Sequence, residues 1–202
     1  MALLSEAQPR IAAIVLAAGR STRMGQLNKL LADIGGKPMV RRVVETALAS
    51  RAEPVLAVTG HMVSEVASAL AGLAVTLVTN PDFATGLASS LKAGIKALPD
   101  GSDGALIVLG DMPLIEPDQI DLLLDAYAPD TIVVPTHDAR IGNPVLWPAR
   151  YFPELLQLEG DAGARRLLHV HAERLREVPI ATDAIFADID TPEALAGLRR
   201  RS

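Results

Sequence analysis

The residues best suited to chemistry form a loop near the start of the chain, directly after the apolar run from Ile11 to Leu16. This loop reads Leu16-Ala17-Ala18-Gly19-Arg20-Ser21-Thr22-Arg23-Met24-Gly25, and Lys29 follows it. Glycines at 19 and 25 let the backbone approach a ligand and point its amides inward. The cations Arg20, Arg23 and Lys29 supply charge-assisted hydrogen bonds suited to phosphate oxygens. The pattern predicts a triphosphate-binding loop.

The spacing of this loop differs from that of two well-known phosphate loops. Its glycines enclose five residues and no Lys-Ser/Thr pair follows, unlike a Walker loop, and it lacks the closely spaced first glycines of the dinucleotide fingerprint. We expect Arg23 to contact phosphate as a bidentate donor and Lys29 as a point charge. An exposed basic loop is the alternative. Ser21 could donate either to a phosphate or to the loop's own backbone.

Short apolar runs alternate with longer segments of helical period along the chain. This alternation predicts an α/β fold with a Rossmann-like, mostly parallel sheet covered by helices on both faces. The expected strands are 11–17, 54–59, 74–79, 104–109 and 131–135. The expected helices are 38–49, 63–70, 86–98 and 117–127, with a tight turn at Gly35-Gly36 before the first.

The pattern changes after residue 135, but no linker or repeat separates a second domain. We therefore expect one domain over residues 1–202, with a nucleotide-binding core at 10–135. Residues 136–202 are expected to form a cap over one edge of the sheet that contacts the second substrate. Its expected elements are strands 143–147 and 174–179 and helices 151–158, 162–170 and 191–200. Trp147 is interpreted as core of this cap rather than as a stacking platform.

Glycines and polar residues follow several of the expected strand ends. They are the first loop, Thr59-Gly60, Asn80-Pro81 and Gly110-Asp111. Because ligands of open α/β sheets bind beyond the carboxyl ends of the strands, these residues should converge on one cleft. Asp111 is the first candidate ligand for Mg²⁺, which is usually held by one or two carboxylates together with substrate phosphates. A simple turn aspartate is the alternative.

Asp190 is the second candidate carboxylate. The segment Asp190-Thr191-Pro192-Glu193 also fits the start of a helix, with Asp190 as N-cap and proline in the first turn. The sequence around Asp190 therefore leaves two roles open, metal binding and helix capping. Asp188 takes its place as ligand if Asp190 only caps.

Two helix starts and one strand start carry further polar candidates. The helix that begins near residue 86 has Ser89 in its first turn, where free amides favour an anionic or ribose partner and capping is the alternative. Asp161 precedes another helix as a candidate N-cap, and Gly163 and Arg165 behind it could hold a phosphate or a pterin edge. Asn143 presents amide donors and an acceptor to a polar ligand.

Composition excludes several classes of protein. A net charge of −5 and an aromatic content of 3% argue against a nucleic-acid partner. The absence of cysteine suits a reducing cytoplasm. We find no signal peptide and no apolar run near the ~20 residues of a membrane helix, so we expect a soluble, cytoplasmic protein with no membrane partner.

The first loop resembles the signature of the MobA-like nucleotidyltransferases, L-A-[AG]-G-x-S-x-R-M-G followed by K. Further motifs recur in the same order in the molybdenum cofactor cytidylyltransferase branch. They are Gly110-Asp111-Met112-Pro113, Gly142-Asn143-Pro144-Val145-Leu146, Gly160-Asp161-Ala162-Gly163-Ala164-Arg165 and Asp188-Ile189-Asp190-Thr191-Pro192. The resemblance implies a three-layer α/β/α fold of the nucleotide-diphospho-sugar transferase type.

This resemblance also implies a function. A cytidylyl group would pass from CTP to the phosphate of molybdopterin, with Mg²⁺ or Mn²⁺ held by Asp111 and Asp190, and with Arg23 and Lys29 on the phosphates. The small-molecule partners would be CTP and molybdopterin, and the product would reach a molybdoenzyme or its chaperone by transient contact. Guanylyl transfer, transfer to a sugar or polyol phosphate, and a non-catalytic nucleotide or pterin carrier stay open as alternatives.

Base choice is predicted from one position of the first loop. In the resembling families this position is alanine in the cytidylyl branch, as at Ala18, and a second glycine in the guanylyl branch. The Ala18 methyl group would fill space that a purine edge needs and so favour the smaller pyrimidine. We expect further base contacts from Thr59 and Gly60.

Overall fold

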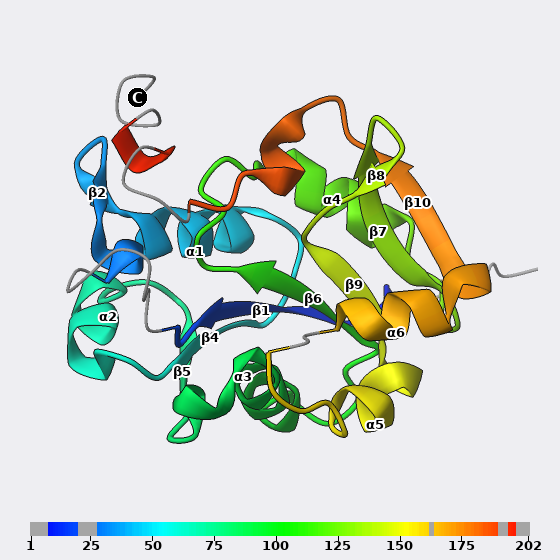
Figure 1. The fold of residues 1–202 in the computed structure, drawn as a ribbon, viewed down its shortest axis with the longest axis horizontal. Helices are drawn as coiled ribbons and strands as arrows, with labels where there is room; N and C mark the ends of the chain where they lie inside the picture. The colour runs from blue at the N-terminus through cyan, green and yellow to red at the C-terminus, as the bar shows by residue number, and fades with distance from the viewer. Residues whose placement is uncertain (1–7, 20–27, 162–163, 190–193, 197–202) are drawn as a thin grey trace, which may run out of the picture.

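A mostly parallel β-sheet forms the centre of the structure, a computed structural model that describes residues 8–19, 28–161, 164–189 and 194–196 (Figure 1). In this part of the chain the main sheet has eight strands in the order β10-β7-β9-β6-β1-β4-β5, with β8 paired to β7. The strands are β1 (Ile11–Ala17), β4 (Val55–Thr59), β5 (Thr76–Thr79), β6 (Gly104–Leu109), β7 (Ile132–His137), β8 (Arg140–Ile141), β9 (Val145–Pro148) and β10 (Leu175–Pro179). β8 and β9 run antiparallel to their neighbours, whereas the other pairs of this sheet are parallel.

Strand β1 shows why the sheet is covered on both faces. All seven of its residues are buried. Ala13 and Val15 belong to one apolar cluster, and Ile14 and Leu16 belong to another on the opposite face. A strand that is apolar at every position buries both faces only if helices cover both sides of the sheet.

The helices provide those two layers. α1 (Met39–Ala49), α2 (Val63–Ala69) and α4 (Pro117–Asp125) pack in the first cluster, while α3 (Leu87–Lys96), α5 (Phe152–Leu155) and α6 (Arg165–Val170) pack in the second. The predicted three-layer α/β/α fold is therefore confirmed. Within the described ranges, no helix is long and apolar enough to cross a membrane.

Most predicted elements within the described residues agree with the structure to within two residues at each end, and 11–17 and 104–109 agree at both ends. The predicted helix 151–158 is shorter. It begins as the 3-10 turn η4 (Ala149–Tyr151), continues as α5 and ends at Leu155. The chain then leaves the helical path and brings residues 160 and 161 to the start of α3. Of the predicted helix 191–200, residues 194–196 are helical and the remainder lies outside the described residues.

The region expected to cap the sheet contributes three of the described strands of the sheet, β8, β9 and β10. β9 lies between β6 and β7, and β10 forms an edge beside β7. All four residues of β9 are buried, which suits a strand inside the sheet rather than a separate cap. Trp147 is therefore part of the core beneath α3, α5 and α6.

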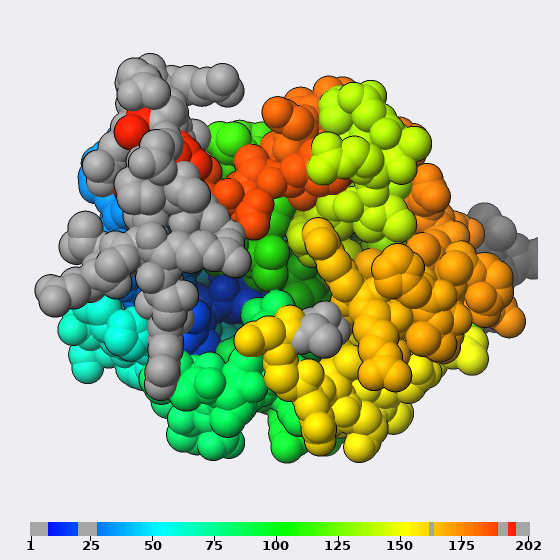
Figure 2. Space-filling view, viewed as in Figure 1, coloured from blue at the N-terminus to red at the C-terminus, as the bar shows by residue number. Residues whose placement is uncertain are grey.

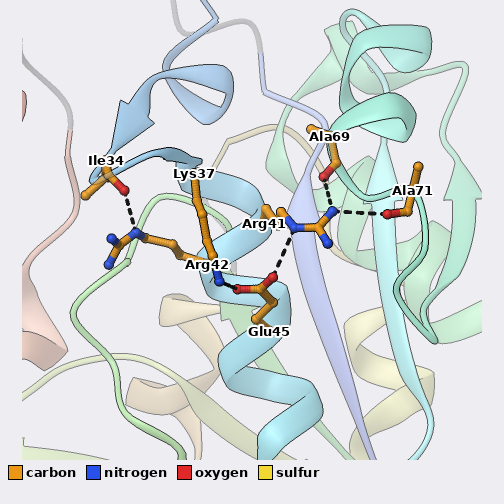
Figure 3. Close-up of polar contacts among 7 residues, drawn as sticks. All are labelled: Ile34, Lys37, Arg41, Arg42, Glu45, Ala69 and Ala71. Atoms are coloured by element: carbon orange, nitrogen blue, oxygen red, sulfur yellow. Dashed lines mark hydrogen bonds and ion pairs between the residues drawn. The ribbon is translucent and has the colours of Figure 1, made fainter.

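A small hairpin precedes α1 and carries the chain away from the first loop. β2 (Asp33–Ile34) and β3 (Lys37–Pro38) form it, with the predicted tight turn at Gly35 and Gly36, whose φ values are 57° and 83°. Arg42 Nε on α1 donates to the Ile34 carbonyl over 2.7 Å (Figure 3). This bond fixes the hairpin to α1.

A second set of contacts ties α1 to α2 and to the hairpin. Arg41 Nη1 donates to the carbonyls of Ala69 and Ala71, at 2.9 and 3.1 Å, and so satisfies the end of α2 (Figure 3). Glu45 accepts from Lys37 Nζ at 2.7 Å and from Arg41 Nε at 3.0 Å. The hydrogen bond from Lys37 is the main reason that the pKa of Glu45 lies below its ordinary value. These contacts hold Lys37 of the hairpin and the end of α2 against α1.

Candidate active site

A cavity of about 600 Å³ opens where β1 and β6 end. Figure 2 shows a hollow on this face, between the yellow and orange segments of the last third of the chain and the green atoms of α3 and β6. The walls come from β1, β6, β8, β9, α3, α6 and the chain after the 3-10 turn η6 (Asp183–Phe186). Its size is within the range of about 300–1,000 Å³ typical of small-molecule sites. Four of the predicted site residues line it: Leu16, Asn143, Asp161 and Arg165.

Lys29 and Asp111 form an ion pair in which Lys29 Nζ lies 2.5 Å from Asp111 Oδ2. Lys29 begins the 3-10 turn η2 (Lys29–Leu31), which Asn28 caps by accepting from the Leu30 amide at 3.1 Å. Asp111 follows the end of β6. The two side chains are 14% and 16% exposed, so solvent and ligands reach them only partly. The predicted phosphate-binding cation and the predicted metal ligand are thus neighbours.

The backbone places Asp111 at the border of the cavity. The next residue, Met112, lines it. The Gly110 amide donates to the carbonyl of Leu16 over 3.0 Å, and Leu16 also lines the cavity. A Cβ atom on Gly110 would lie 2.8 Å from that carbonyl oxygen. Glycine is needed here for the close approach to β1, and a ligand contact from Gly110 stays a prediction.

The chain that leads to Asp190 is attached to Asp111. The Ile189 amide donates to the Asp111 carbonyl over 3.0 Å. Asp188, one residue earlier, is exposed and lines the cavity. Asp190 itself lies outside the described residues, so its choice between metal binding and capping stays open.

Asn143 and Arg140 form part of the cavity wall on the side of β8 and β9. The Asn143 backbone amide donates to Ile185 at 3.0 Å, whereas its side-chain amide has no hydrogen-bond partner among the described residues. That amide is available to a ligand. Arg140 was not predicted, and its guanidinium carbon lies 4.4 Å from the centroid of the Phe186 ring in a cation–π contact. No motif marks Arg140, because β8 reaches the cavity only through its pairing with β7.

The start of α3 is closed by the loop at residues 160 and 161. Asp161 Oδ1 accepts from the Leu87 amide at 3.2 Å, and the Gly160 carbonyl accepts from the Ala88 amide at 3.1 Å. The Ser89 amide bonds to Gly86. The amides expected to be free for an anion or a ribose are therefore occupied by the protein. Asp161 does cap a helix, but that helix is α3 rather than the one that follows Asp161.

This closure makes Gly86 intolerant of a side chain. Gly86 has φ +115°, and a Cβ atom there would lie 2.5 Å from the Gly160 carbonyl carbon. We expect Gly86→Ala to lower the free energy of unfolding by about 1–2 kcal/mol for backbone strain and about 1–3 kcal/mol more for the clash. Gly72→Ala is the matched control, because Gly72 has φ +81° but nothing within 4 Å of an added Cβ. The free energies of unfolding are measured by urea titration. Equal losses for the two variants would show that the loop at residues 160 and 161 moves aside at no cost in free energy.

Asn80 and Ser89 hydrogen-bond to each other. Asn80 is buried, and its Nδ2 donates to Ser89 Oγ at 2.9 Å and to Ser90 Oγ at 3.1 Å, while its Oδ1 accepts from the Asp82 amide at 3.0 Å. Ser89 Oγ also donates to the Gly86 carbonyl at 2.8 Å. These atoms fix the turn between β5 and α3. Neither residue lines the cavity, and their predicted ligand contacts stay untested.

The two residues expected to contact the base are buried at the end of β4. The Thr59 hydroxyl group lies 3.4 Å from the Val78 carbonyl oxygen, and its residue is 1% exposed. A Cβ atom on Gly60 would lie 2.5 Å from the Cβ of Phe83 and 2.9 Å from the Cβ of Ala18. The methyl group of Ala18 therefore points toward Gly60, and neither Thr59 nor Gly60 lines the cavity.

The remaining predicted residues fall into two groups. Ala17 is buried in the cluster beneath α1, and Gly19 is exposed with open space around it. The other predicted residues lie outside the described part of the chain: Arg20, Ser21, Arg23, Gly25 and Gly163.

The donor set around Asp111 fits Mg²⁺ or Mn²⁺ if substrate phosphates complete it. No group of three or more His, Asp or Glu side chains with metal-ligand geometry occurs in the described part of the chain. Mg²⁺ does not need one, since one or two carboxylates with phosphate oxygens and water satisfy it. Asp111 supplies one carboxylate, and the chain attached to it continues into Asp190. This chemistry suits a cation that arrives with a triphosphate.

Comparison with known proteins identifies relatives over nearly the whole chain. A purine catabolism protein, PucB, from Bacillus subtilis (strain 168) is 34% identical over 201 residues, which are 95% of this chain and 97% of PucB. A probable molybdenum cofactor guanylyltransferase from Natronomonas pharaonis is 28% identical over 203 residues, 93% of this chain and 96% of that protein. The chain therefore shares full-length similarity with proteins of two different names.

A solved structure and a family match complete the comparison. The structure is a Mycobacterium tuberculosis H37Rv protein in complex with manganese, with a TM-score of 0.80 and 25% identity over 96% of this chain and all of that one. The MobA-like NTP transferase domain matches residues 13–178. The resemblance to the MobA-like nucleotidyltransferases is confirmed by this match. The chain is a nucleotidyltransferase that belongs to the family of MobA-like NTP transferases.

Proposed function

We propose that the protein transfers a cytidylyl group from CTP to the terminal phosphate of molybdopterin, and releases pyrophosphate. One observation carries this proposal. A cavity of about 600 Å³ lies beside the Lys29–Asp111 pair, where a second substrate would meet the α-phosphate of a bound nucleotide. Asn143, Arg165 and Arg140 in its wall suit a polar, anionic acceptor.

In this proposal different parts of the chain bind the two substrates. The first loop and the ends of β1 and β4 would hold CTP. The cavity is walled largely by residues within 140–147, by residue 161, by residues within 164–168 and by residues within 185–188, and would hold the acceptor. This is the role expected of the last third of the chain, although its strands belong to the main sheet.

No general base is needed for this reaction. The acceptor phosphate is already ionised, so catalysis rests on placing its oxygen in line with the α-phosphorus and on stabilising charge. Lys29 and Arg23 would hold the triphosphate, and Asn143 and Arg165 would orient the acceptor. Asp111 and Asp190 would hold Mg²⁺ or Mn²⁺, which offsets the charge that develops on the phosphates.

A pyrophosphate-release assay tests the proposal. The purified protein is given Mg²⁺, molybdopterin and each of the four ribonucleoside triphosphates in turn. Release with CTP and formation of a cytosine dinucleotide are expected. If no triphosphate gives pyrophosphate release, molybdopterin is not the acceptor. If pyrophosphate is released only when a sugar phosphate takes the place of molybdopterin, the acceptor is a sugar phosphate instead.

Guanylyl transfer is the second candidate, favoured by the name of the Natronomonas relative. Base choice separates the two. We expect kcat/KM for CTP to exceed that for GTP at least ~100-fold, and Ala18→Gly to reduce this ratio without reversing it, because one methyl group supplies only about 1–3 kcal/mol of discrimination. The variant removes the methyl group of a residue that is 3% exposed, and this methyl group points toward Gly60, so its removal would leave room for a purine edge.

The control for this variant is Ala17→Gly, one residue earlier on the opposite face of β1. It removes the same methyl group from a position under α1 and should lower stability without changing the ratio of CTP to GTP use. Equal use of GTP and CTP by the unmodified protein would refute the assignment to the cytidylyl branch and leave the assignment as a nucleotidyltransferase intact.

A further inference from the structure

Residues 180–189 form a strap that runs from the end of β10 to the border of the cavity. The strap begins on β7, where the Ile180 amide donates to the Thr136 carbonyl at 2.8 Å. It ends beside Asp111, whose carbonyl accepts from the Ile189 amide at 3.0 Å. In Figure 1 the strap is the dark orange segment that passes near β8 on its way toward the end of β6. Its last residues and Asp111 are therefore held together through the backbone.

Gly142 and Asn143 contact the middle of the strap. The Asn143 backbone amide donates to the Ile185 carbonyl at 3.0 Å, and a Cβ atom on Gly142 would lie 2.5 Å from that carbonyl oxygen and 2.8 Å from the Ile185 Cβ. Gly142 has no left-handed φ, so this contact needs the missing side chain of glycine and not its conformational freedom. On its other side the Gly142 amide donates to the Pro135 carbonyl of β7 at 3.0 Å. Because Gly142 is fixed to β7, an added methyl group would displace the strap.

The contacts at Ile185 and at Ile189 lie four residues apart in the chain. Between them, the Phe186 ring packs under Arg140, with 4.4 Å from the ring centroid to the guanidinium carbon. Asp188, in the same span, is exposed and lines the cavity. Closely packed segments pass a displacement on, since their interior has few voids to absorb it. A shift of Ile185 should therefore reach Asp188 and Ile189.

We infer that Gly142 is a positioning residue for the divalent cation: by admitting the strap close to β7, it sets where the end of the strap lies relative to Asp111. The inference rests on the proposed function, in which Asp111 and Asp190 hold the cation. Mg²⁺ demands near-ideal octahedral geometry, so a small displacement of the chain at Ile189 weakens its binding. Gly142 acts through the strap, and it needs no contact with the cation or with either substrate.

The experiment measures how much Mg²⁺ strengthens the binding of CTP. CTP is titrated by calorimetry into the unmodified protein and into Gly142→Ala, once with Mg²⁺ and once with EDTA. The ratio of the two dissociation constants reports the contribution of the cation. We expect Gly142→Ala to reduce this ratio about 10-fold, since residues that orient metal ligands typically affect metal affinity by about 10- to 100-fold. Binding of CTP in EDTA should stay unchanged, because the strap does not hold the nucleotide.

Gly104→Ala is the matched control for a clash without a positioning role. Gly104 begins β6, at the opposite end of that strand from Asp111, and a Cβ atom there would lie 3.0 Å from the Trp147 carbonyl oxygen. Like Gly142→Ala, this variant should lower the free energy of unfolding. Unlike Gly142→Ala, it should leave the ratio of the two dissociation constants unchanged.

Phe186→Leu tests the strap without adding a clash, and it serves if Gly142→Ala does not fold. The variant keeps an apolar side chain at the strap but removes the ring that packs under Arg140. We expect it to reduce the ratio about 3-fold, the effect of losing one cation–π contact.

An unchanged ratio in Gly142→Ala would overturn the inference, as would an unchanged ratio in Phe186→Leu if Gly142→Ala does not fold. An equal fall of the ratio in Gly104→Ala would overturn it too, because any clash would then have the same effect. So would CTP binding by the unmodified protein that Mg²⁺ does not strengthen. The proposed function fails separately: if the ratio falls as expected but no triphosphate gives pyrophosphate release, the inference stands and cytidylyl transfer is refuted.

Discussion

Asp111→Asn lowers kcat at least ~100-fold in our expectation, because the substitution removes a negative charge from the position where a divalent cation and the phosphates would meet. The amide keeps the size of the side chain. The Lys29–Asp111 pair is partly exposed, so water can hydrate the Lys29 ammonium when its partner is neutral, and we expect the thermal midpoint to fall by only a few degrees. Pyrophosphate release and thermal unfolding measure the two effects.

A double variant shows whether Asp111 acts on the cation or only on Lys29. If Asp111 serves only to neutralise Lys29, then adding Asp111→Asn to Lys29→Met should cause no further loss of turnover beyond that of Lys29→Met alone. We expect the double variant to recover stability but to turn over far more slowly than Lys29→Met. Asp100→Asn is the control and should retain full activity, because Asp100 is an exposed carboxylate just before the start of β6, at the opposite end of that strand from Asp111. Turnover above a tenth of the unmodified value in Asp111→Asn would contradict a metal-binding role.

Asp190→Ala is the second large effect that we expect, again at least ~100-fold in kcat with little change in stability. The sequence alone allows a helix cap, and a lost cap has a different signature, a loss of about 1 kcal/mol in stability with activity retained. The hydrogen bond from the Ile189 amide to the Asp111 backbone carbonyl supports the catalytic interpretation, since it holds the residue before Asp190 beside the backbone of Asp111.

Asp188→Ala is the matched comparison for Asp190. Asp188 carries the same side chain two residues earlier and lines the cavity. If Asp190 is the ligand, Asp188→Ala should affect mainly the KM for the acceptor. If Asp188→Ala instead loses kcat while Asp190→Ala stays active but is less stable, Asp188 is the metal ligand and Asp190 is the helix cap.

Local sequence patterns were enough to predict the layers of the fold. β1 is apolar at all seven positions. Such a run indicates a strand that is buried on both faces, wherever it lies in the chain. The turn at Gly35 and Gly36 was predictable for the same reason, because positive φ is a local demand that glycine meets. The Lys29–Asp111 contact agrees with the expectation that residues after the strand ends converge, although the pair itself was not predicted.

Residues whose roles depend on distant partners were not predictable in this way. Asp161 has the sequence signature of a cap for the helix behind it, yet its carboxylate caps α3, 74 residues away in the chain. Asn80 has the same polar side chain whether it faces a ligand or Ser89 and Ser90, and only the packing of α3 against β5 selects the second.

The last third of the chain shows the same limit on a larger scale. The residues of β9 read as a strand, and the structure bears this out, but strand order depends on which edges meet when the chain collapses. β9 inserts between β6 and β7 because its four residues can bury both faces there, and this insertion carries Asn143 and Trp147 to the cavity. Composition and periodicity report the environment that each segment needs. Which other segment supplies that environment is a property of long-range packing, and it is this packing that shapes the cavity.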